Sequence, residues 1–246
     1  MSSRLDGRTA LVTGSTSGIG RAVATSLAAR GAHVLVSGRD VARGHRAVAE
    51  LRATGAADFV PADLSTFTGT RELATRALEV TGRVDILVNN AGIFRFGPTS
   101  DTAEATFDGT YAVNVKAPYF LVQALVPRMA EHGSGAVVNI LSGAAHRGSV
   151  AAGLYGSSKA ALLLLTTSWA AEFGPAGVRV NAVSAGPIRT EGTADGAGLE
   201  PVAAALPARR LGLPDEVAAA VAFLASDDAA YVHGAILPVD GGAIAA

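Results

Sequence analysis

Short runs of apolar residues alternate along this chain with longer segments of helical periodicity. The apolar runs predict strands at residues 9–13, 33–37, 58–61, 85–89, 136–141, 178–183 and 235–239. Helices are expected at 21–28, 41–53, after Ser65, and at 102–131, 153–173 and 214–225. An uninterrupted apolar run is typical of a parallel strand that is covered on both faces. The alternation therefore predicts an α/β fold in which helices cover both faces of a parallel sheet.

Composition narrows the classes of protein that fit. The 246 residues show no linker or repeat, so we expect a single domain over 1–246. The chain has no cysteine, which excludes disulfides and thiolate catalysis, and its five histidines lack metal-ligand spacing, so we expect no metal site. A net charge of −1 gives no attraction for nucleic acid, and no apolar run is long enough to cross a membrane. We expect a soluble, cytoplasmic protein.

A glycine-rich turn follows the first strand and leads into a helix. Its sequence is Gly14-Ser15-Thr16-Ser17-Gly18-Ile19-Gly20. Gly14 permits a tight turn, Gly18 lets backbone N–H groups approach a pyrophosphate, and Gly20 lets helix and strand pack closely. The helix N-terminus then faces the anion. The pattern indicates a dinucleotide site, although a plain βα turn that tolerates glycine fits it too.

The residues after the second strand bear on which dinucleotide binds. An acidic residue there would hold the ribose hydroxyl of NAD, whereas an arginine accommodates the 2′-phosphate of NADP. This strand ends at Gly38 and is followed by Arg39, which favours NADP(H). Asp40 could instead take the hydroxyl, and Ser17 stands where a second basic residue would support the phosphate, so NAD(H) stays open.

Tyr155 and Lys159 are four residues apart, on one face of the helix expected over 153–173. A nearby ammonium favours the phenolate and commonly shifts a pKa by about 1–3 units. Ser142 follows the fifth strand, so its hydroxyl can bond a substrate oxygen as charge develops. The three side chains predict proton transfer between an alcohol and a carbonyl. A buried tyrosine beside a solvated lysine is the alternative for the isolated pattern.

Other polar positions follow the third and fourth strands. Asp63 and Leu64 could face an adenine ring or cap the helix after Ser65. The small-residue turn Asn89-Asn90-Ala91-Gly92 lets backbone lie against a flat ligand. Asn114 lies inside the helix expected over 102–131, where asparagine is a mediocre helix former, so it makes a polar contact or holds a water near the lysine.

The later loops and the long helix carry three further expectations. The Gly-, Ala- and Pro-rich segment about 187–212 is predicted to be a lid over the substrate. His146 and Arg147 could line the pocket, or be solvated loop residues. The run Leu162–Leu165 with Trp169 leaves more apolar surface than one core-facing stripe needs, which favours burial against a second subunit over burial within the chain.

In this order and spacing, the motifs resemble the short-chain dehydrogenase/reductase family over nearly the whole chain, and the 3-oxoacyl-(acyl carrier protein) reductase branch most of all. The matching tail is Pro238-Val239-Asp240-Gly241-Gly242. The resemblance implies one Rossmann-like, doubly wound domain with a seven-stranded parallel sheet in the order 3-2-1-4-5-6-7, commonly assembled as a homotetramer or dimer. Together with Arg39, the resemblance makes an NADPH-dependent reductase of a ketone or 3-oxoacyl group the leading hypothesis. The alternatives are an NAD-dependent dehydrogenase of a secondary alcohol, sugar or steroid, and a nucleotide-sensing protein without turnover.

The resemblance assigns roles to particular residues. Tyr155 would exchange the proton, Ser142 would position the carbonyl, Lys159 would bind the nicotinamide ribose and lower the pKa of the phenol, and Asn114 would hold a relay water. The implied cofactor contacts are Gly14, Ser15, Ser17, Gly18, Ile19, Gly20, Arg39, Asp63, Leu64, Asn90, Ala91, Gly92, Tyr155, Lys159, Gly186, Ile188 and Thr190. The chain departs from the family at Ala185-Gly186-Pro187, where relatives usually have Pro-Gly.

Overall fold

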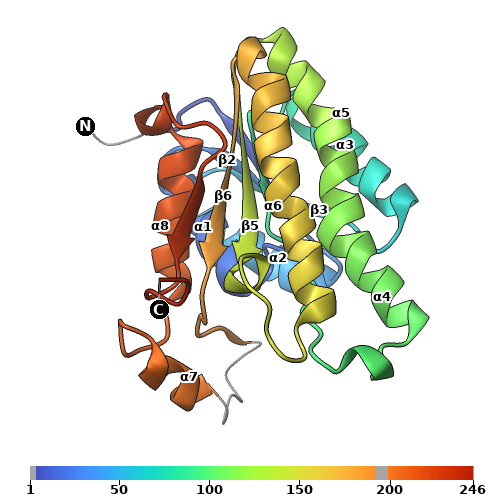
Figure 1. The fold of residues 1–246 in the computed structure, drawn as a ribbon. Helices are drawn as coiled ribbons and strands as arrows, with labels where there is room; N and C mark the ends of the chain where they lie inside the picture. Colours follow the sequence, from blue (N-terminus) through green and yellow to red (C-terminus); the bar gives the residue numbers. More distant parts are fainter. Residues whose placement is uncertain (1–3, 192–198, 246) are drawn as a thin grey trace.

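Seven parallel strands form one sheet at the centre of the computed structural model, which describes residues 4–191 and 199–245 (Figure 1). Their order is β3-β2-β1-β4-β5-β6-β7, so the predicted fold class and strand order are confirmed. The strands are β1 (Thr9–Val12), β2 (His33–Gly38), β3 (Ala57–Pro61), β4 (Ile86–Asn89), β5 (Gly135–Ser142), β6 (Val178–Ala185) and β7 (Ile236–Val239).

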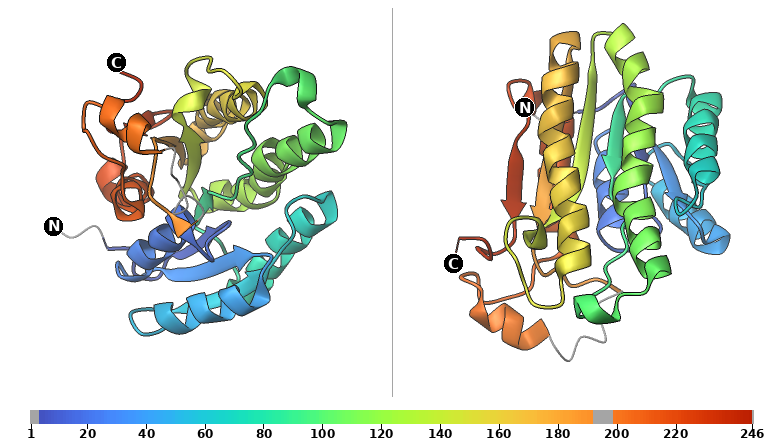
Figure 2. Two further views of the ribbon diagram at one scale, coloured as in Figure 1. Left: turned by 90° about the horizontal axis from the view of Figure 1, so that it is seen from below. Right: turned by 45° about the vertical axis from the view of Figure 1, so that its right-hand side comes forward.

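Helices cover both faces of the sheet. One core packs against α1 (Gly18–Ala28), α2 (Val41–Leu51) and α8 (Pro214–Ala225). The other packs against α3 (Phe67–Thr81), α5 (Ala117–Glu131) and α6 (Gly153–Phe173), which stand side by side in the right-hand view of Figure 2. Side chains alternate between the cores along each strand, because successive residues of a strand point to opposite faces. The remaining short elements are η1 (Thr99–Asp101), α4 (Glu104–Tyr111), η2 (Ala112–Lys116), η3 (Gly143–Ala145), η4 (Gly174–Ala176), α7 (Leu199–Ala205) and η6 (Asp227–Ala229).

The single helix predicted over 102–131 is wrong in its middle. Between α4 and α5 the chain makes the wide π-helical turn η2, in which the N–H of Ala117 bonds the carbonyl of Ala112. Pro118 supplies the physical reason, because proline has no N–H for the carbonyl four residues earlier and its ring crowds that carbonyl. That earlier residue is Asn114, which is buried in the turn.

A chain of buried polar side chains fixes α6 to the sheet. The amide of Asn89 in β4 donates to Asn139 in β5 at 2.8 Å, and the amide of Asn139 donates to the hydroxyl of Thr166 in α6 at 2.9 Å. Buried hydrogen bonds of this kind specify one orientation of the packed elements. The long helix is therefore held at a defined position over β4 and β5.

The predicted lid lies at the carboxyl end of the sheet, where α7 is drawn below the strands in Figure 1. Its two ends are paired: the N–H of Gly212 bonds the carbonyl of Pro187 at 2.9 Å, and the N–H of Arg189 bonds that of Gly212 at 2.9 Å. Residues 192–198 of the predicted lid lie outside the described residues. These two backbone hydrogen bonds therefore hold the ends of the segment together.

The apolar surface of α6 is divided between the core and the exterior. Trp169 and Leu162 are buried within the chain, so burial inside the monomer is the correct reading for both, and the sequence-based preference for a partner subunit is wrong there. Leu164 is 66% exposed. Within the described ranges, no helix combines the length and apolarity that crossing a membrane requires.

Candidate active site

A cavity of about 960 Å³ opens at the carboxyl end of the sheet. It is bounded by the ends of β4, β5 and β6, the first turns of α1 and α6, and α7. The predicted site residues that line it are Ser17, Gly18, Ile19, Gly20, Asn90, Gly92, Ser142, Tyr155, Lys159, Gly186, Ile188 and Thr190. Those that do not line it are Gly14, Ser15, Arg39, Asp63, Leu64, Ala91 and Asn114. Ligands of open parallel sheets bind at this edge.

The glycine turn is held tightly against the end of β4. Gly14 has a φ of +63°, and a Cβ there would lie 2.9 Å from the Cα of Ala91. A Cβ at Gly20 would overlap the carbonyl of Gly14. The amide of Asn90 donates to the carbonyls of Thr13 and Gly14, at 2.8 and 3.1 Å. Only glycine fits these two positions, as the sequence pattern requires.

Ser15 has a structural use within this turn. Its hydroxyl donates to the carbonyl of Val12 at 2.6 Å and accepts from the N–H of Ser37 at 3.0 Å. It is fully buried. The side chain thus joins the turn to β2 and does not face the cavity.

The N-terminus of α1 fits a phosphate group. Ser17, its N-cap, makes no side-chain capping bond, and the first turn contains no acidic residue. The backbone N–H groups of a first turn carry partial positive charge and point along the axis, which makes such a terminus an anion site. Gly18, Ile19 and Gly20 of this turn line the cavity. The residues present therefore suit the pyrophosphate of a dinucleotide.

Arg39 and Asp40, which follow β2, are the two residues expected to discriminate between NADP(H) and NAD(H). Arg39 is exposed. Asp40 caps α2, since its carboxylate accepts from the N–H of Arg43 at 2.9 Å and pairs with the guanidinium of Arg43 at 2.9 Å. This commitment disfavours Asp40 as the ligand of a ribose hydroxyl. The carboxylate of Asp40 is thus already engaged by the backbone and side chain of Arg43.

At the end of β3, hydrogen bonds from the backbone and hydroxyl of Ser65 hold the pKa of Asp63 below its usual range, and the charge of Arg39 adds to this. Leu64 is buried in the core. The N-cap of α3 is Thr66, whose hydroxyl accepts from the N–H of Gly69 at 3.0 Å. Asp63 therefore closes the turn before the helix without being its N-cap.

Ser142, Tyr155 and Lys159 meet in the cavity. A hydrogen bond from Ser142 lowers the pKa of Tyr155, but the larger effect is burial of the phenol, which raises that pKa overall. The ammonium of Lys159 donates to the carbonyl of Ile140 at 2.9 Å. Burial lowers the pKa of Lys159 to about 8. The net pKa of the phenol is therefore raised in this structure, where a lowered one was expected, because desolvation is the larger effect.

The side-chain amide of Asn114 is hydrogen-bonded to neighbouring residues. The amide nitrogen donates to the carbonyl of Ile93 at 2.9 Å and to the hydroxyl of Ser158 at 3.0 Å, and the amide oxygen accepts from the N–H of Ile93 at 2.8 Å. Both N–H bonds of the amide are used, so the side chain does not offer a donor to a relay water. It instead joins η2 to the loop after β4 and to α6.

Ser158 is a positioning residue that the sequence pattern did not reveal. It is fully buried, and its hydroxyl donates to the carbonyl of Tyr155 at 2.7 Å while accepting from Asn114. The available signal was a small polar residue inside the Tyr155–Lys159 turn, on the face that the helix buries.

Apolar side chains form the other walls of the cavity. Phe96 lies edge to face with Tyr155 at 5.5 Å between ring centroids. The remaining apolar lining includes Phe94, Val202, Leu206, Pro207, Ala243 and Ile244. The sequence did not lead us to expect the two C-terminal residues of this lining, Ala243 and Ile244. Their signal was the turn-forming stretch Asp240-Gly241-Gly242, since an aspartate can accept from N–H groups just ahead of it in a turn.

Asp240 holds that C-terminal wall in place. Its carboxylate accepts from the N–H of Gly242 at 2.9 Å and from the N–H of Ile244 at 3.0 Å. The N–H of Ala208, just after α7, bonds the carbonyl of Gly241 at 3.0 Å. The residues just after α7 and the C-terminal segment are therefore joined in one wall of the cavity.

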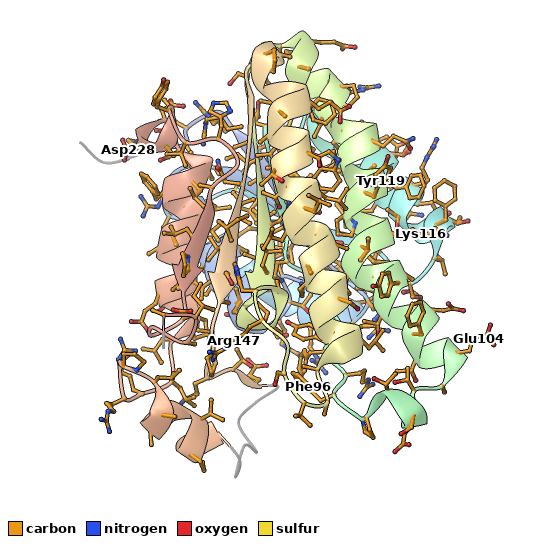
Figure 3. The ribbon with its side chains drawn as sticks, viewed as in Figure 1. Phe96, Glu104, Lys116, Tyr119, Arg147 and Asp228 are labelled. Atoms are coloured by element: carbon orange, nitrogen blue, oxygen red, sulfur yellow. The ribbon has the colours of Figure 1, made fainter. Side chains whose placement is uncertain are left out.

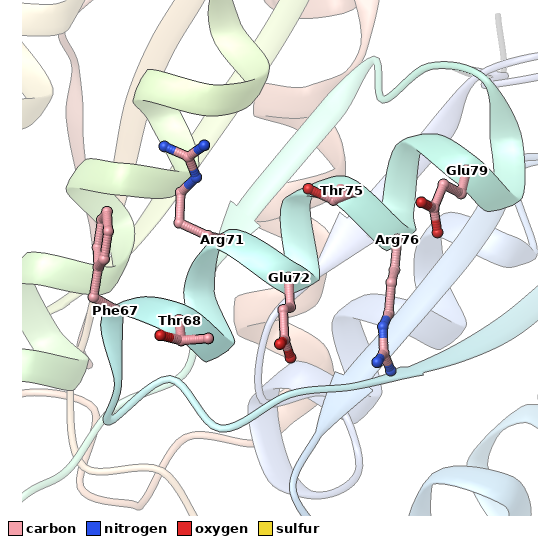
Figure 4. A pocket seen from close by; sticks show the side chains of 7 residues that line it. All are labelled: Phe67, Thr68, Arg71, Glu72, Thr75, Arg76 and Glu79. Carbon is pink, nitrogen blue, oxygen red and sulfur yellow. The ribbon is translucent and has the colours of Figure 1, made fainter.

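A second hollow of about 510 Å³ lies on α3, away from these residues (Figure 4). It is lined by Phe67, Thr68, Arg71, Glu72, Thr75, Arg76 and Glu79. Its alternating charges are typical of a solvated helix face. In the part of the chain that the structure describes, no three His, Cys, Asp or Glu side chains gather as a metal site would require.

Comparisons with known proteins agree with this geometry. The family described as enoyl-(acyl carrier protein) reductase matches residues 14–243. The D-threitol dehydrogenase of Mycolicibacterium smegmatis is 37% identical, over 97% of this chain and 94% of its own length.

Two solved structures superpose closely. A short-chain dehydrogenase/reductase family protein has a TM-score of 0.93 at 48% identity, covering 99% of this chain and 100% of its own. A gluconate 5-dehydrogenase from Burkholderia cenocepacia J2315, in complex with NADP and tartrate, has a TM-score of 0.93 at 31% identity, covering 100% of this chain and 98% of its own. The fold, the cavity and these matches show that this chain belongs to the short-chain dehydrogenase/reductase family. It is an oxidoreductase that uses NAD(P) to interconvert alcohols and carbonyls.

Proposed function

We propose that this protein is an NADPH-dependent reductase of a ketone or 3-oxoacyl group, with Tyr155 as the proton donor. The observation that carries the proposal is the meeting of Ser142, Tyr155 and buried Lys159 in one cavity beside the uncapped N-terminus of α1. Hydride transfer is the chemistry that a nicotinamide supplies when bound.

Ser142, Tyr155 and Lys159 have different roles in the proposed reaction. Ser142 donates a hydrogen bond to the carbonyl oxygen and so fixes its position as negative charge develops. Tyr155 gives its proton to that oxygen as the alcohol forms. Lys159 keeps a positive charge one helical turn away, which favours the phenolate left behind. We also assign Lys159 to binding of the nicotinamide ribose.

The electrostatics suit the direction of reduction. A raised pKa keeps the phenol of Tyr155 protonated at neutral pH, which is the state that a proton donor needs. Lys159, with a pKa of about 8, is still mostly charged at pH 7. Both groups therefore begin the reductive step in the required form.

The preference for NADP(H) rests on the end of β2. Gly38 there carries no acid, Asp40 is committed to capping α2, and exposed Arg39 is near enough to Asp63 to affect its pKa. The Burkholderia cenocepacia neighbour has NADP bound, which supports the same choice. NAD(H) is the alternative, because Ser17 offers no second positive charge.

Oxidation of a secondary alcohol is the second candidate, favoured by relatives named for D-threitol and gluconate. The apolar walls at Phe94 and Phe96 support a less polar carbonyl compound over a polyol. A nucleotide-sensing role without turnover is disfavoured by the presence of all three reactive side chains in one cavity.

A carbonyl screen tests the proposed function. Oxidation of NADPH is followed with 3-oxoacyl thioesters, ketones, quinones and sugar-derived carbonyls, in the wild type and in Tyr155→Phe. We expect turnover that falls about 10²–10⁴-fold in the variant, because only the dissociable proton is lost. NADPH binding, measured by its fluorescence, should be retained. NADPH binding with no turnover across the panel, or a variant with near-normal kcat, would contradict the proposal.

We also propose that α5 and α6 form a subunit interface of a homotetramer or dimer. Tyr119 on α5 is 46% exposed and Leu164 on α6 is 66% exposed, and large apolar side chains on adjacent helices commonly mark an interface. Light scattering should give the mass of an oligomer, and Leu164→Glu should shift it toward the monomer.

A further inference from the structure

The charge of the cavity is one-sided. Among the described residues that line it, two are cationic, Arg147 and Lys159, and none is acidic. Lys159 is buried and donates to the carbonyl of Ile140. Arg147 lies on the loop between β5 and α6, and Figure 3 shows it with Phe96 at the carboxyl end of the sheet. The described lining therefore favours a negative group, and Arg147 is its exposed cation.

The loop that carries Arg147 is fixed at its base. The ring nitrogen Nε2 of His146 lies 3.1 Å from the hydroxyl of Ser184 in β6, so this histidine bonds the sheet and does not line the cavity. The hydroxyl of Ser142 accepts from the N–H of Ala144 at 3.3 Å. These contacts tie the loop to the ends of β5 and β6. Arg147, the next residue after this anchor, is exposed and lines the cavity.

The walls around this arginine are apolar. Phe96 contacts Tyr155, and Phe94, Leu206 and Ile244 line the same cavity. Such walls accommodate the hydrocarbon body of a ligand, and the few polar groups of a pocket fix its orientation. A guanidinium is planar and presents paired N–H donors that match the two oxygens of a carboxylate.

We propose that the substrate is a carbonyl compound that also carries a carboxylate, bound by Arg147, and an apolar body, accommodated by the apolar walls. The proposal rests on the reductase activity proposed above. In the reaction, hydride goes to the carbonyl carbon and the proton of Tyr155 goes to the carbonyl oxygen. NADPH is oxidised to NADP⁺, and the carboxylate is unchanged.

Matched acids and esters test the proposal. Benzoylformate, benzoylpropionate and benzoylbutyrate vary the separation of carboxylate and ketone, and the methyl ester of each removes the charge while keeping the body. The enzymes compared are the wild type, Arg147→Gln, Arg147→Lys and Arg95→Gln. Arg95 is an exposed arginine between Phe94 and Phe96 that does not line the cavity, so its substitution controls for a general loss of positive charge.

The expected pattern is specific to one residue and one charge. For at least one chain length, the wild type should reduce the acid with a kcat/KM roughly tenfold or more above that of its ester. Arg147→Gln should lower kcat/KM for the acid about tenfold and leave the ester unchanged. Arg147→Lys should recover part of the loss, and Arg95→Gln should leave both substrates unaffected.

Two results would overturn the inference while leaving the reductase intact. One is equal reduction of acid and ester by the wild type at every length, and the other is a parallel loss for acid and ester in Arg147→Gln. If no carbonyl of any kind is reduced, the proposed function fails, and calorimetry with benzoylpropionate and the NADP⁺ complex decides the binding site separately. Binding that Arg147→Gln abolishes would support the site, and absence of binding to the wild type would overturn it.

Discussion

The side-chain amide of Asn114 donates to the hydroxyl of Ser158 at 3.0 Å, and this hydroxyl donates to the backbone carbonyl of Tyr155 at 2.7 Å. The wide turn η2 is thus connected through one buried serine to the first turn of α6. Because that turn carries Tyr155, the proposed proton donor, the position of the phenol depends on Asn114, which does not line the cavity.

Ser158→Ala should test this dependence. The change leaves a buried N–H of Asn114 without its acceptor, so the free energy of unfolding should fall by about 1–3 kcal/mol in denaturant titrations. Displacement of Tyr155 should lower kcat roughly tenfold, with little change in the KM for NADPH. Ser157→Ala, at the exposed neighbouring serine, is the matched control and should behave as the wild type. Equal effects of the two substitutions would contradict the positioning role.

Lys159 should make stability depend on pH in alkaline solution. Its pKa is about 8 in the folded protein against an ordinary 10.5, so the unfolded state binds more protons between these values. The contribution of Lys159 to the free energy of unfolding therefore rises with pH across that window, by about 3 kcal/mol in all. In denaturant titrations from pH 7 to above 10, the free energy of unfolding of the wild type should rise relative to that of Lys159→Met. A constant difference between the two proteins would show that burial does not lower the pKa of Lys159.

Arg39→Ala should weaken binding of NADPH more than binding of NADH. A guanidinium on a 2′-phosphate contributes charge-assisted hydrogen bonds, so the ratio of the two Kd values should change by roughly tenfold or more. Fluorescence titration of both cofactors measures it. Arg43→Ala, at a nearby arginine whose guanidinium pairs with Asp40, is the control and should leave the ratio unchanged. Equal weakening of both cofactors in Arg39→Ala would indicate lost packing and remove the basis for the NADP(H) preference.

Asp240→Ala should loosen the C-terminal wall of the cavity. The change frees the N–H groups of Gly242 and Ile244, so Ile244 would no longer be held in the wall of the cavity. We expect the KM for the carbonyl substrate to rise several-fold while the KM for NADPH stays near its wild-type value, since uniform binding energy is what is lost. Asp228→Ala, at an exposed aspartate in η6, is the control. A rise in both KM values would point to a general loss of structure.

The sequence by itself determined the elements and much of the reactive centre. Apolar runs and helical periodicity are local properties, so they located the seven strands and most helices to within a few residues. Gly14 and Gly20 could be assigned because only glycine tolerates such close backbone contacts. Tyr155 and Lys159 could be paired because helical geometry alone puts residues four apart on one face.

Only the tertiary structure decided how distant segments act on those residues. His146 and Ser184, or Ala208 and Gly241, meet through packing that no local periodicity encodes. The pKa of Tyr155 is raised and not lowered, because desolvation depends on how deeply the folded chain buries a group, whereas the sequence records only its neighbours along the helix. The wide turn at Asn114 likewise combines a local cause, Pro118, with partners in the loop after β4 and in α6 that only folding brings into reach.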